Sequence, residues 1–215
     1  MSDQQAELEW RDGDIPVSQR FDDPYFSLQG GLDETRHVFL AGNDLPVRFA
    51  DGFRVAELGF GTGLNFLATL MAWRASGIGG RLHFTSFEAY PMAADDLARA
   101  LAPFAGLLPT HILTERSQAD DFALEVIAGD ARATLPAWDG RADAWYLDGF
   151  SPAKNPELWG ADLMQAVSDH TAKGGTAATY TAAGHVRRSL QLAGFSVERV
   201  AGFGRKRHMT RARLM

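Results

Sequence analysis

Residues 57–63, Glu57-Leu58-Gly59-Phe60-Gly61-Thr62-Gly63, form a glycine-rich turn between an apolar segment and a helical pattern. A strand is predicted over 53–58, and apolar side chains follow at helical spacing over 65–75. Glycine lets the backbone turn sharply and pass close to a ligand. The G-x-G-x-G spacing departs from the G-x-G-x-x-G fingerprint of dinucleotide sites, and no Lys-Ser/Thr pair follows as in a Walker loop. The turn therefore predicts a cofactor loop of another kind.

The chain beyond this loop alternates strands and helices. Strands are predicted over 82–88, 124–127, 142–147 and 176–181, and helices over 92–101, 156–171 and 185–193. Two last β segments, 195–200 and 208–214, have no helix between them. Such alternation implies a mostly parallel, doubly wound sheet covered on both faces, and the final pair implies an antiparallel edge. We therefore predict an α/β fold of the Rossmann type that S-adenosylmethionine-dependent methyltransferases adopt.

Residues 1–50 precede this pattern and predict a small β extension packed on a main domain of residues 51–215. Segments 7–11 and 16–20 flank the turn Asp12-Gly13-Asp14, which indicates a β-hairpin. A short helix over 34–40 is expected, with Asp33 as its N-cap.

Acidic residues stand at the ends of three successive predicted strands: Glu57, Glu88 and Asp130. In open α/β sheets, ligands bind beyond the carboxyl ends of the strands. An acid two positions before the first glycine is typical of S-adenosylmethionine sites, where Glu57 would lie near the amino-acid part of the cofactor. Glu88 would accept two ribose hydroxyls, and Asp130 the adenine amino group. We therefore expect S-adenosylmethionine rather than NAD or FAD.

The fourth strand ends in Asp148-Gly149-Phe150-Ser151-Pro152 and would face the transferred methyl group. A carboxylate there can orient an amine and take a proton from it, and Phe150 can stack on a planar base. The alternative is that this segment is only a tight turn after the strand, with Phe150 buried for structural reasons. Lys154 and Asn155 continue a polar stretch that would line a substrate mouth, whereas Trp159 fits the core at least as well.

Charge is distributed unevenly along the chain. The net charge is −6, yet residues 185–215 carry eight Lys and Arg against Glu198 alone. Screening over about 8–10 Å makes local patches matter more than the total charge. This basic C-terminal edge, which contains Arg205, Lys206 and Arg207, is either a polyanion-binding surface or a set of solvated strand ends.

Several function classes are excluded by residue type. The chain has no cysteine, so a disulfide framework, a cysteine zinc site and a thiol nucleophile are ruled out. Its six histidines lack metal-ligand spacing, so no metal is expected. No G-x-S-x-G elbow occurs, which argues against a serine hydrolase. The N-terminus is polar, and no apolar run approaches the ~20 residues of a membrane span. We therefore expect a cytoplasmic protein that does not bind membranes.

Four blocks, residues 31–39, 42–43, 57–66 and 146–156, resemble the tRNA 5-methylaminomethyl-2-thiouridine methyltransferase family. The resemblance implies methyl transfer from S-adenosylmethionine to the primary amine of 5-aminomethyl-2-thiouridine, at the wobble position in the anticodon loop of tRNA. By motif position, the cofactor-binding residues would be Glu57, Gly59, Phe60, Gly61, Thr62, Gly63, Asn65, Glu88, Asp130, Ala131, Asp148 and Asn43. Asp148 and Phe150 would be catalytic. The substrate-binding residues would be Phe150, Lys154, Asn155, Arg205, Lys206 and Arg207.

The bifunctional form of this family also carries a C-terminal flavin-dependent oxidoreductase domain. This chain ends at Met215 without a second dinucleotide fingerprint. We therefore expect a stand-alone methyltransferase or a fragment, with a separate enzyme that supplies the aminomethyl intermediate. Binding of tRNA would rest on the basic C-terminal edge, with Arg36 and Arg48 as further candidates.

Three alternatives remain open. The chain could be a methyltransferase of the same fold that acts on a small-molecule or protein amine, for which the basic C-terminal edge would have no use. It could be an S-adenosylmethionine-sensing protein without catalysis, although the four acids argue against that. It could be a flavin or nicotinamide oxidoreductase, which the G-x-G-x-G loop disfavours.

Overall fold

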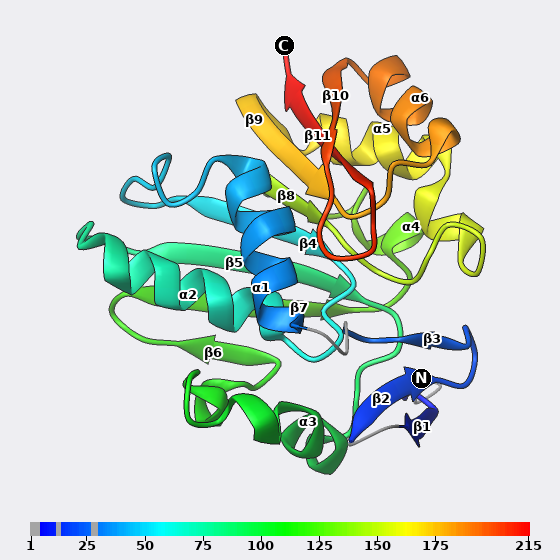
Figure 1. Cartoon of the computed structure of the whole chain (residues 1–215). Coiled ribbons are helices and arrows are strands. Elements are labelled where there is room, and N and C mark those ends of the chain that lie inside the picture. Colours follow the sequence, from blue (N-terminus) through cyan, green and yellow to red (C-terminus); the bar gives the residue numbers. More distant parts are fainter. Residues whose placement is uncertain (1–4, 12–13, 27–29) are drawn as a thin grey trace.

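A mostly parallel β-sheet forms the centre of the computed structural model (Figure 1). The structure describes residues 5–11, 14–26 and 30–215, and within these the central sheet has eight strands in the order β10-β11-β9-β8-β4-β5-β7-β6. The strands are β4 (Arg54–Leu58), β5 (Leu82–Glu88), β6 (Arg116–Gln118), β7 (Phe122–Ala128), β8 (Ala142–Leu147), β9 (Thr171–Thr179), β10 (Phe195–Ala201) and β11 (His208–Leu214). Strands β7, β5, β4, β8 and β9 pair in parallel, so their carboxyl ends meet at one edge.

Helices cover both faces of this sheet, each over its own buried apolar cluster. The helices are α1 (Gly31–Thr35), α2 (Leu64–Ser76), α3 (Ala94–Leu101), α4 (Ala131–Thr134), α5 (Ala161–Asp169) and α6 (Gly184–Leu192). The short turns are a π-helix η1 (Arg36–Leu40) and the 3-10 segments η2 (Ala41–Asn43), η3 (Ala102–Phe104), η4 (Thr110–Ile112) and η5 (Pro156–Trp159). One cluster joins α2 and η1 to the sheet, and the other joins α4, α5 and α6 to it. The predicted doubly wound α/β fold is therefore confirmed.

Local details of this sheet differ from the sequence prediction. The predicted antiparallel edge is present as β10 and β11, and within it β11 is inserted between β9 and β10, a strand order that was not predicted. A second antiparallel strand, β6, pairs with β7 and was not predicted. The helix expected over 156–171 is interrupted because Gly160 has an extended backbone, with φ −67° and ψ 155°.

The N-terminal residues form a separate three-stranded sheet of β1 (Leu8–Arg11), β2 (Ile15–Ser18) and β3 (Asp23–Pro24). Antiparallel pairing of β1 with β2 confirms the predicted hairpin, although Asp12 and Gly13 of its turn lie outside the described residues. Helix α1 begins earlier than expected, after Gly30 in a left-handed conformation rather than at an Asp33 cap.

Segment η1 is part of the main core, since Val38, Phe39 and Leu40 are buried in the same cluster as Phe66 and Tyr146. Residues before position 50 thus contribute to the main core, and the predicted division into an extension of residues 1–50 and a domain of residues 51–215 stays a prediction.

No helix in the described part of the chain is both long and apolar enough to span a membrane.

Candidate active site

A cavity of about 930 Å³ opens at the carboxyl ends of β4, β5, β7 and β8. This volume suits a small-molecule site, for which about 300–1,000 Å³ is usual. The sequence-predicted residues that line it are Gly59, Phe60, Gly61, Thr62, Asn65, Glu88, Asp130, Ala131, Asp148, Phe150, Asn155, Arg205 and Lys206. Further lining residues come from the segment 20–26 around β3, from α1, and from Tyr180 just after β9. The structure thus brings most of the predicted residues together.

The glycine loop forms part of the cavity wall. Gly59, Gly61 and Gly63 all have positive φ angles, of 82°, 54° and 73°, where side chains are strained. A Cβ on Gly59 would lie 3.3 Å from Gly149 Cα, and one on Gly61 would lie 3.2 Å from the Tyr25 ring. Gly63 directly precedes α2 and packs on Phe60 without lining the cavity. Gly59 and Gly61 therefore line the cavity directly, and Gly63 supports the loop through its contact with Phe60.

Glu88 ends β5 with its carboxylate held toward the cavity. Its Oε2 accepts the Gly61 N–H at 2.9 Å, and its Oε1 accepts the Tyr90 N–H at 2.8 Å. Burial raises the pKa of Glu88 despite these hydrogen bonds. Each oxygen keeps a further lone pair, so the carboxylate can still accept a pair of hydroxyl groups.

Asp130 lines the cavity at the end of β7, but it has a partner that the sequence did not reveal. It caps α4 by accepting the Arg132 N–H at 2.9 Å, and it forms an ion pair with the Arg132 guanidinium at 2.6 Å. These contacts with Arg132 lower the pKa of Asp130. Arg132 also lines the cavity, so the two side chains meet a ligand as a pair.

Glu57 does not face the cavity, although the sequence predicted that it lies near the amino-acid part of the cofactor. It is fully buried and does not line the cavity. Its Oε1 accepts a hydrogen bond from Asn65 Nδ2 at 2.8 Å, and its Oε2 accepts one from Ser86 Oγ at 2.7 Å. Burial, reinforced by the nearby Asp148, raises the pKa of Glu57 well above its ordinary value. Glu57 therefore holds Asn65 and has no surface in the cavity where a cofactor contact was expected.

Asn65 links this buried acid to Asp148. Its Nδ2 donates to Asp148 Oδ2 at 2.8 Å as well as to Glu57, while its Oδ1 accepts from Thr35 Oγ1 at 2.8 Å. The other Asp148 oxygen accepts the Gly149 N–H at 2.8 Å. Burial raises the pKa of Asp148 to about 6. Asp148 thus faces the cavity in a fixed orientation, and its pKa suits proton transfer near neutral pH.

Phe150 lies beside Asp148 in an aromatic cluster with the N-terminal segment. Its ring stacks on Phe21 with centroids 4.7 Å apart, and Tyr25 meets it edge-on at 5.0 Å. Trp159 is buried, as the core interpretation expected, and its Nε1 donates to the Phe150 carbonyl at 2.9 Å. One face of Phe150 is therefore covered by Phe21, a residue that the sequence did not single out.

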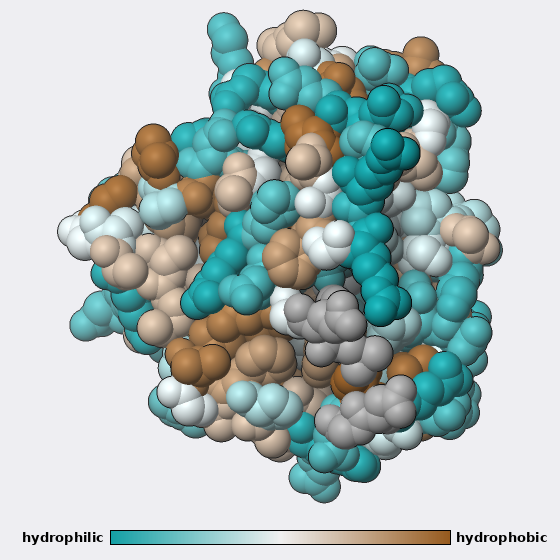
Figure 2. Space-filling view, viewed as in Figure 1, coloured by the Kyte–Doolittle hydropathy of each residue, from teal (hydrophilic) through white to brown (hydrophobic). Residues whose placement is uncertain are grey.

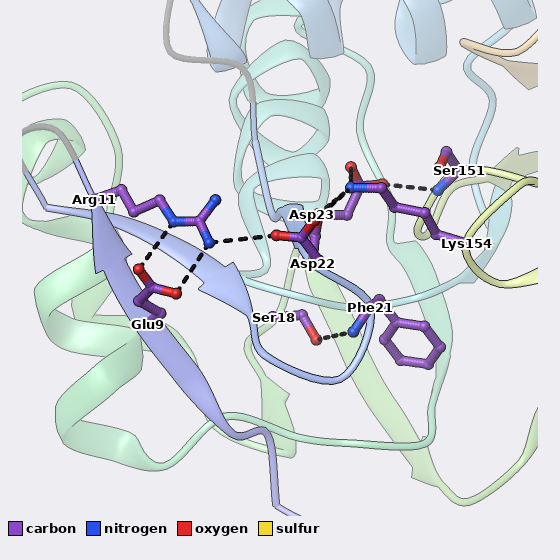
Figure 3. Close-up of polar contacts among 8 residues, drawn as sticks. All are labelled: Glu9, Arg11, Ser18, Phe21, Asp22, Asp23, Ser151 and Lys154. Carbon is purple, nitrogen blue, oxygen red and sulfur yellow. Dashed lines mark hydrogen bonds and ion pairs between the residues drawn. The ribbon is translucent and has the colours of Figure 1, made fainter.

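Lys154 does not line the cavity and is used to hold the N-terminal segment (Figure 3). Its ammonium contacts the Asp22 carbonyl and lies 3.5 Å from a carboxylate oxygen of each of Asp22 and Asp23. The Ser151 N–H donates to Asp23 Oδ2 at 2.9 Å (Figure 3). The structure therefore places Lys154 outside the cavity, so its expected substrate contact stays a prediction, whereas Asn155 does line the cavity.

Asn43 and Arg48 are structural residues away from the cavity. Asn43 is fully buried; its amide donates to the Phe39 and Trp145 carbonyls and accepts from Thr176 Oγ1. The Arg48 guanidinium donates to backbone carbonyls and to Thr176 Oγ1. Asn43 therefore does not reach the cavity where a cofactor contact was expected, and the guanidinium of Arg48 is used within the fold, so its expected contact with tRNA stays a prediction.

The basic C-terminal edge also divides. Arg205 and Lys206 line the cavity, and Arg207 lies outside it. Arg36 is exposed and pairs with Asp33 at 3.1 Å. Among the residues that the structure describes, no three His, Cys, Asp or Glu side chains are grouped as metal ligands would be.

This chain matches a family profile and is similar to curated proteins and to a solved structure. A family profile described as S-adenosyl-L-methionine-dependent methyltransferase matches residues 97–215. The tRNA 5-methylaminomethyl-2-thiouridine biosynthesis bifunctional protein MnmC of Caulobacter sp. is 46% identical, over 99% of this chain and 39% of its own length. The protein of that name from Pseudomonas paraeruginosa is 45% identical, over 97% of this chain and 35% of its own.

The chain thus spans well under half of the length of these curated relatives. The crystal structure of MNMC2 from Aquifex aeolicus superimposes with a TM-score of 0.74 at 25% identity, over 98% of this chain and 71% of that chain. The strand-end cavity, the glycine loop and these similarities agree, and the chain belongs to the S-adenosyl-L-methionine-dependent methyltransferase family.

Proposed function

We propose that this protein methylates the primary amine of 5-aminomethyl-2-thiouridine at the wobble position of tRNA, with S-adenosylmethionine as the methyl donor. The observation that carries the proposal is that Asp148 lines the same cavity as the glycine loop and Glu88. The names of the similar MnmC proteins support tRNA as the substrate. They do not favour a small-molecule or protein amine.

The residues of the cavity fit this cofactor. S-adenosylmethionine, when bound, would supply a methyl group attached to a positively charged sulfur. Glu88 would accept the ribose hydroxyls, and the glycines of the loop would let the cofactor lie against the backbone. Asp130 and Arg132 would lie at the adenine, where the carboxylate accepts the amino group.

Asp148 would act on the substrate amine. A primary amine with a pKa of about 10.4 is protonated at neutral pH and has no free lone pair. The Asp148 carboxylate can accept its hydrogens, orient the nitrogen and remove a proton. Because Asn65 and the Gly149 N–H fix both carboxylate oxygens, the acceptor is already in position before the substrate binds.

The substrate would reach Asp148 past Phe150 and the charged residues of the cavity rim. The wobble base belongs to a single-stranded loop, so exposing it costs less than extruding a base from a duplex. Arg205, which lines the rim, and the neighbouring Arg207 would contact phosphates. We place this reaction in the cytoplasm, after a separate enzyme activity that supplies the primary amine.

Labelled methyl transfer tests the proposal. The purified chain would be incubated with labelled S-adenosylmethionine and tRNA from a strain that lacks this enzyme, followed by nucleoside analysis. We expect the label in 5-methylaminomethyl-2-thiouridine. Parallel reactions would use tRNA from the parent strain, in which the amine is already methylated, and free primary amines. Label in another nucleoside, or in free amines but not in tRNA, would refute the proposal.

A further inference from the structure

Lys206 occupies a specific position at the cavity rim rather than projecting into solvent. It lies in the turn between β10 and β11, a region covered by hydrophilic side chains (Figure 2). Its Nζ lies 2.8 Å from Glu34 Oε1 and 3.9 Å from the centre of the Tyr180 ring. The Glu34 side chain is only 14% exposed, against 46% for Lys206. A largely enclosed carboxylate is thus neutralised by a cation that reaches in from the solvent side.

Glu34 and Tyr180 form an anionic and aromatic cage next to Asp148. The Tyr180 hydroxyl donates to the Gly149 carbonyl at 2.8 Å, so the ring is tied to the residue after Asp148. The buried Trp159 packs edge-on against the same ring, with centroids 6.2 Å apart. Glu34, Tyr180, Asp148 and Lys206 all line the one cavity. A cation in the cage is therefore close to the carboxylate assigned to the amine.

We propose that Glu34 and Tyr180 form the subsite that receives the ammonium of the substrate's aminomethyl group, and that Lys206 fills this subsite until tRNA displaces it. The inference rests on the proposed function. A lysine side chain ends in a primary ammonium on a methylene group, and the aminomethyl substituent ends in the same unit. An anion beside an aromatic face is the chemistry that binds such a group.

This exchange gives Lys206 a different role from its basic neighbours. In the tRNA-free protein its charge is engaged by Glu34, so it does not add to the open phosphate-binding surface. When the substrate ammonium takes its place, the number of cations in the cage stays the same, and the enclosed Glu34 carboxylate remains paired. The displaced lysine can then turn toward the tRNA backbone beside Arg205. Removal of Lys206 should therefore strengthen binding of the free nucleoside and weaken binding of tRNA.

Calorimetry with the free nucleoside tests this exchange. The probe is 5-aminomethyl-2-thiouridine, titrated into the full chain saturated with S-adenosylhomocysteine. We expect Lys206→Met to bind the nucleoside about tenfold more tightly than the wild type, the combined size of one ion pair at the rim and one cation–π contact. Lys173→Met, which removes an exposed lysine on β9, is the matched control and should leave nucleoside binding unchanged.

Two further variants test the cage itself. Glu34→Gln keeps the shape of the side chain but removes its charge, so the double variant Glu34→Gln/Lys206→Met should lose the tenfold gain. Tyr180→Phe keeps the aromatic face, so Lys206→Met combined with Tyr180→Phe should retain most of the tenfold gain in affinity for the nucleoside. Thermal unfolding of each variant, measured alongside, separates a loss of binding from a loss of folding.

The outcomes separate this inference from the function on which it rests. If the wild type transfers label to tRNA but Lys206→Met binds the nucleoside no better, or undetectably, the subsite assignment is wrong and the function stands. If Glu34→Gln/Lys206→Met binds as tightly as Lys206→Met, Glu34 is not the anion that receives the amine. If the wild type methylates no tRNA, the proposed function itself has failed, and the nucleoside titration then decides only whether the cage binds a primary ammonium.

Discussion

The two sides of the cavity are constructed in different ways. On the cofactor side, the Glu88 carboxylate is held by backbone N–H groups of Gly61 and Tyr90, and Glu57 is held by Asn65 and Ser86. These contacts are buried or partly buried, and leaving any of these groups unpaired would cost about 1–3 kcal/mol or more.

On the substrate side, the contacts are ion pairs and aromatic stacks between distant parts of the chain. Lys206 pairs with Glu34 across 172 positions, and Lys154 reaches Asp22 across 132. In both pairs the lysine is reached by solvent, and ion pairs at the surface contribute about 0–1 kcal/mol each, so they can be exchanged for contacts with a ligand. The comparison teaches that the cofactor side is preorganised, whereas the substrate side can rearrange when a large polyanion binds.

The largest effect should come from Asp148, where the two sides meet. Asp148→Asn keeps the shape but removes the proton acceptor, so we expect turnover on tRNA to fall by a factor of roughly 10²–10⁴. Affinity for S-adenosylhomocysteine, measured by calorimetry, should change far less. Asp162→Asn, at an exposed position on α5, is the matched control. Near-normal turnover in Asp148→Asn would show that Asp148 is only a turn residue.

The same carboxylate should cost stability at neutral pH. The folded-state pKa of Asp148 is raised from 3.8 to about 6, so its contribution to stability is fully present below about pH 3.8 and is lost as the pH rises through about 6. This rise corresponds to as much as about 3 kcal/mol. Urea unfolding of wild type and Asp148→Asn at pH 4 and pH 8 measures it. The wild type should lose free energy of unfolding relative to the variant; an equal change in both proteins would contradict the raised pKa.

Glu88 tests whether the cofactor side is preorganised as described. Glu88→Ala removes the acceptor for the Gly61 and Tyr90 N–H groups as well as for the ribose. We expect binding of S-adenosylhomocysteine to weaken by about 1.5–3 kcal/mol, the scale of hydrogen bonds to charged groups. Calorimetry provides the measurement, with Glu157→Ala, another cavity-lining acid, as the comparison. Equal affinities for wild type and Glu88→Ala would remove Glu88 from the cofactor site.

The smallest effect should come from the rim of the substrate side. Affinity for tRNA should fall as salt rises, so a plot of log affinity against log salt has a negative slope. Arg205→Ala should make this slope shallower by a little under one unit, as expected for one lost phosphate contact. S-adenosylhomocysteine binding should stay the same. Filter binding across a salt series measures the slope. If the slope is unchanged, tRNA docks on another surface of the protein.

The sequence predicted the parallel sheet well because alternating apolar runs and glycine turns are local signals. It placed Glu88, Asp130 and Asp148 correctly around one cavity, since the carboxyl ends of parallel strands meet at one edge. It missed β6 and the inserted position of β11, because strand order depends on pairing between distant segments.

The errors at the site have a similar origin. Glu57 lies within β4, whose side chains alternate between the two faces, so proximity to the glycine loop did not settle which way it points. Phe21 and Tyr180 reach the cavity only through long-range docking and gave no motif, and Glu34 lies in the block 31–39 without a chemical signal of its own. Asn43 and Arg48 lie near recognisable blocks, but their polar atoms are used to join η2 and the following segment to β8 and β9.

The position of bound S-adenosylhomocysteine, determined by crystallography of the full chain, tests the central claim most directly. We predict that the ligand lies in the 930 Å³ cavity, with its ribose hydroxyls on Glu88, its adenine at Asp130 and its sulfur on the side of Asp148. Glu57 should remain buried behind Asn65 without touching the ligand. A ligand bound outside this cavity, or bound in it with its ribose away from Glu88 and its sulfur away from Asp148, would contradict the account.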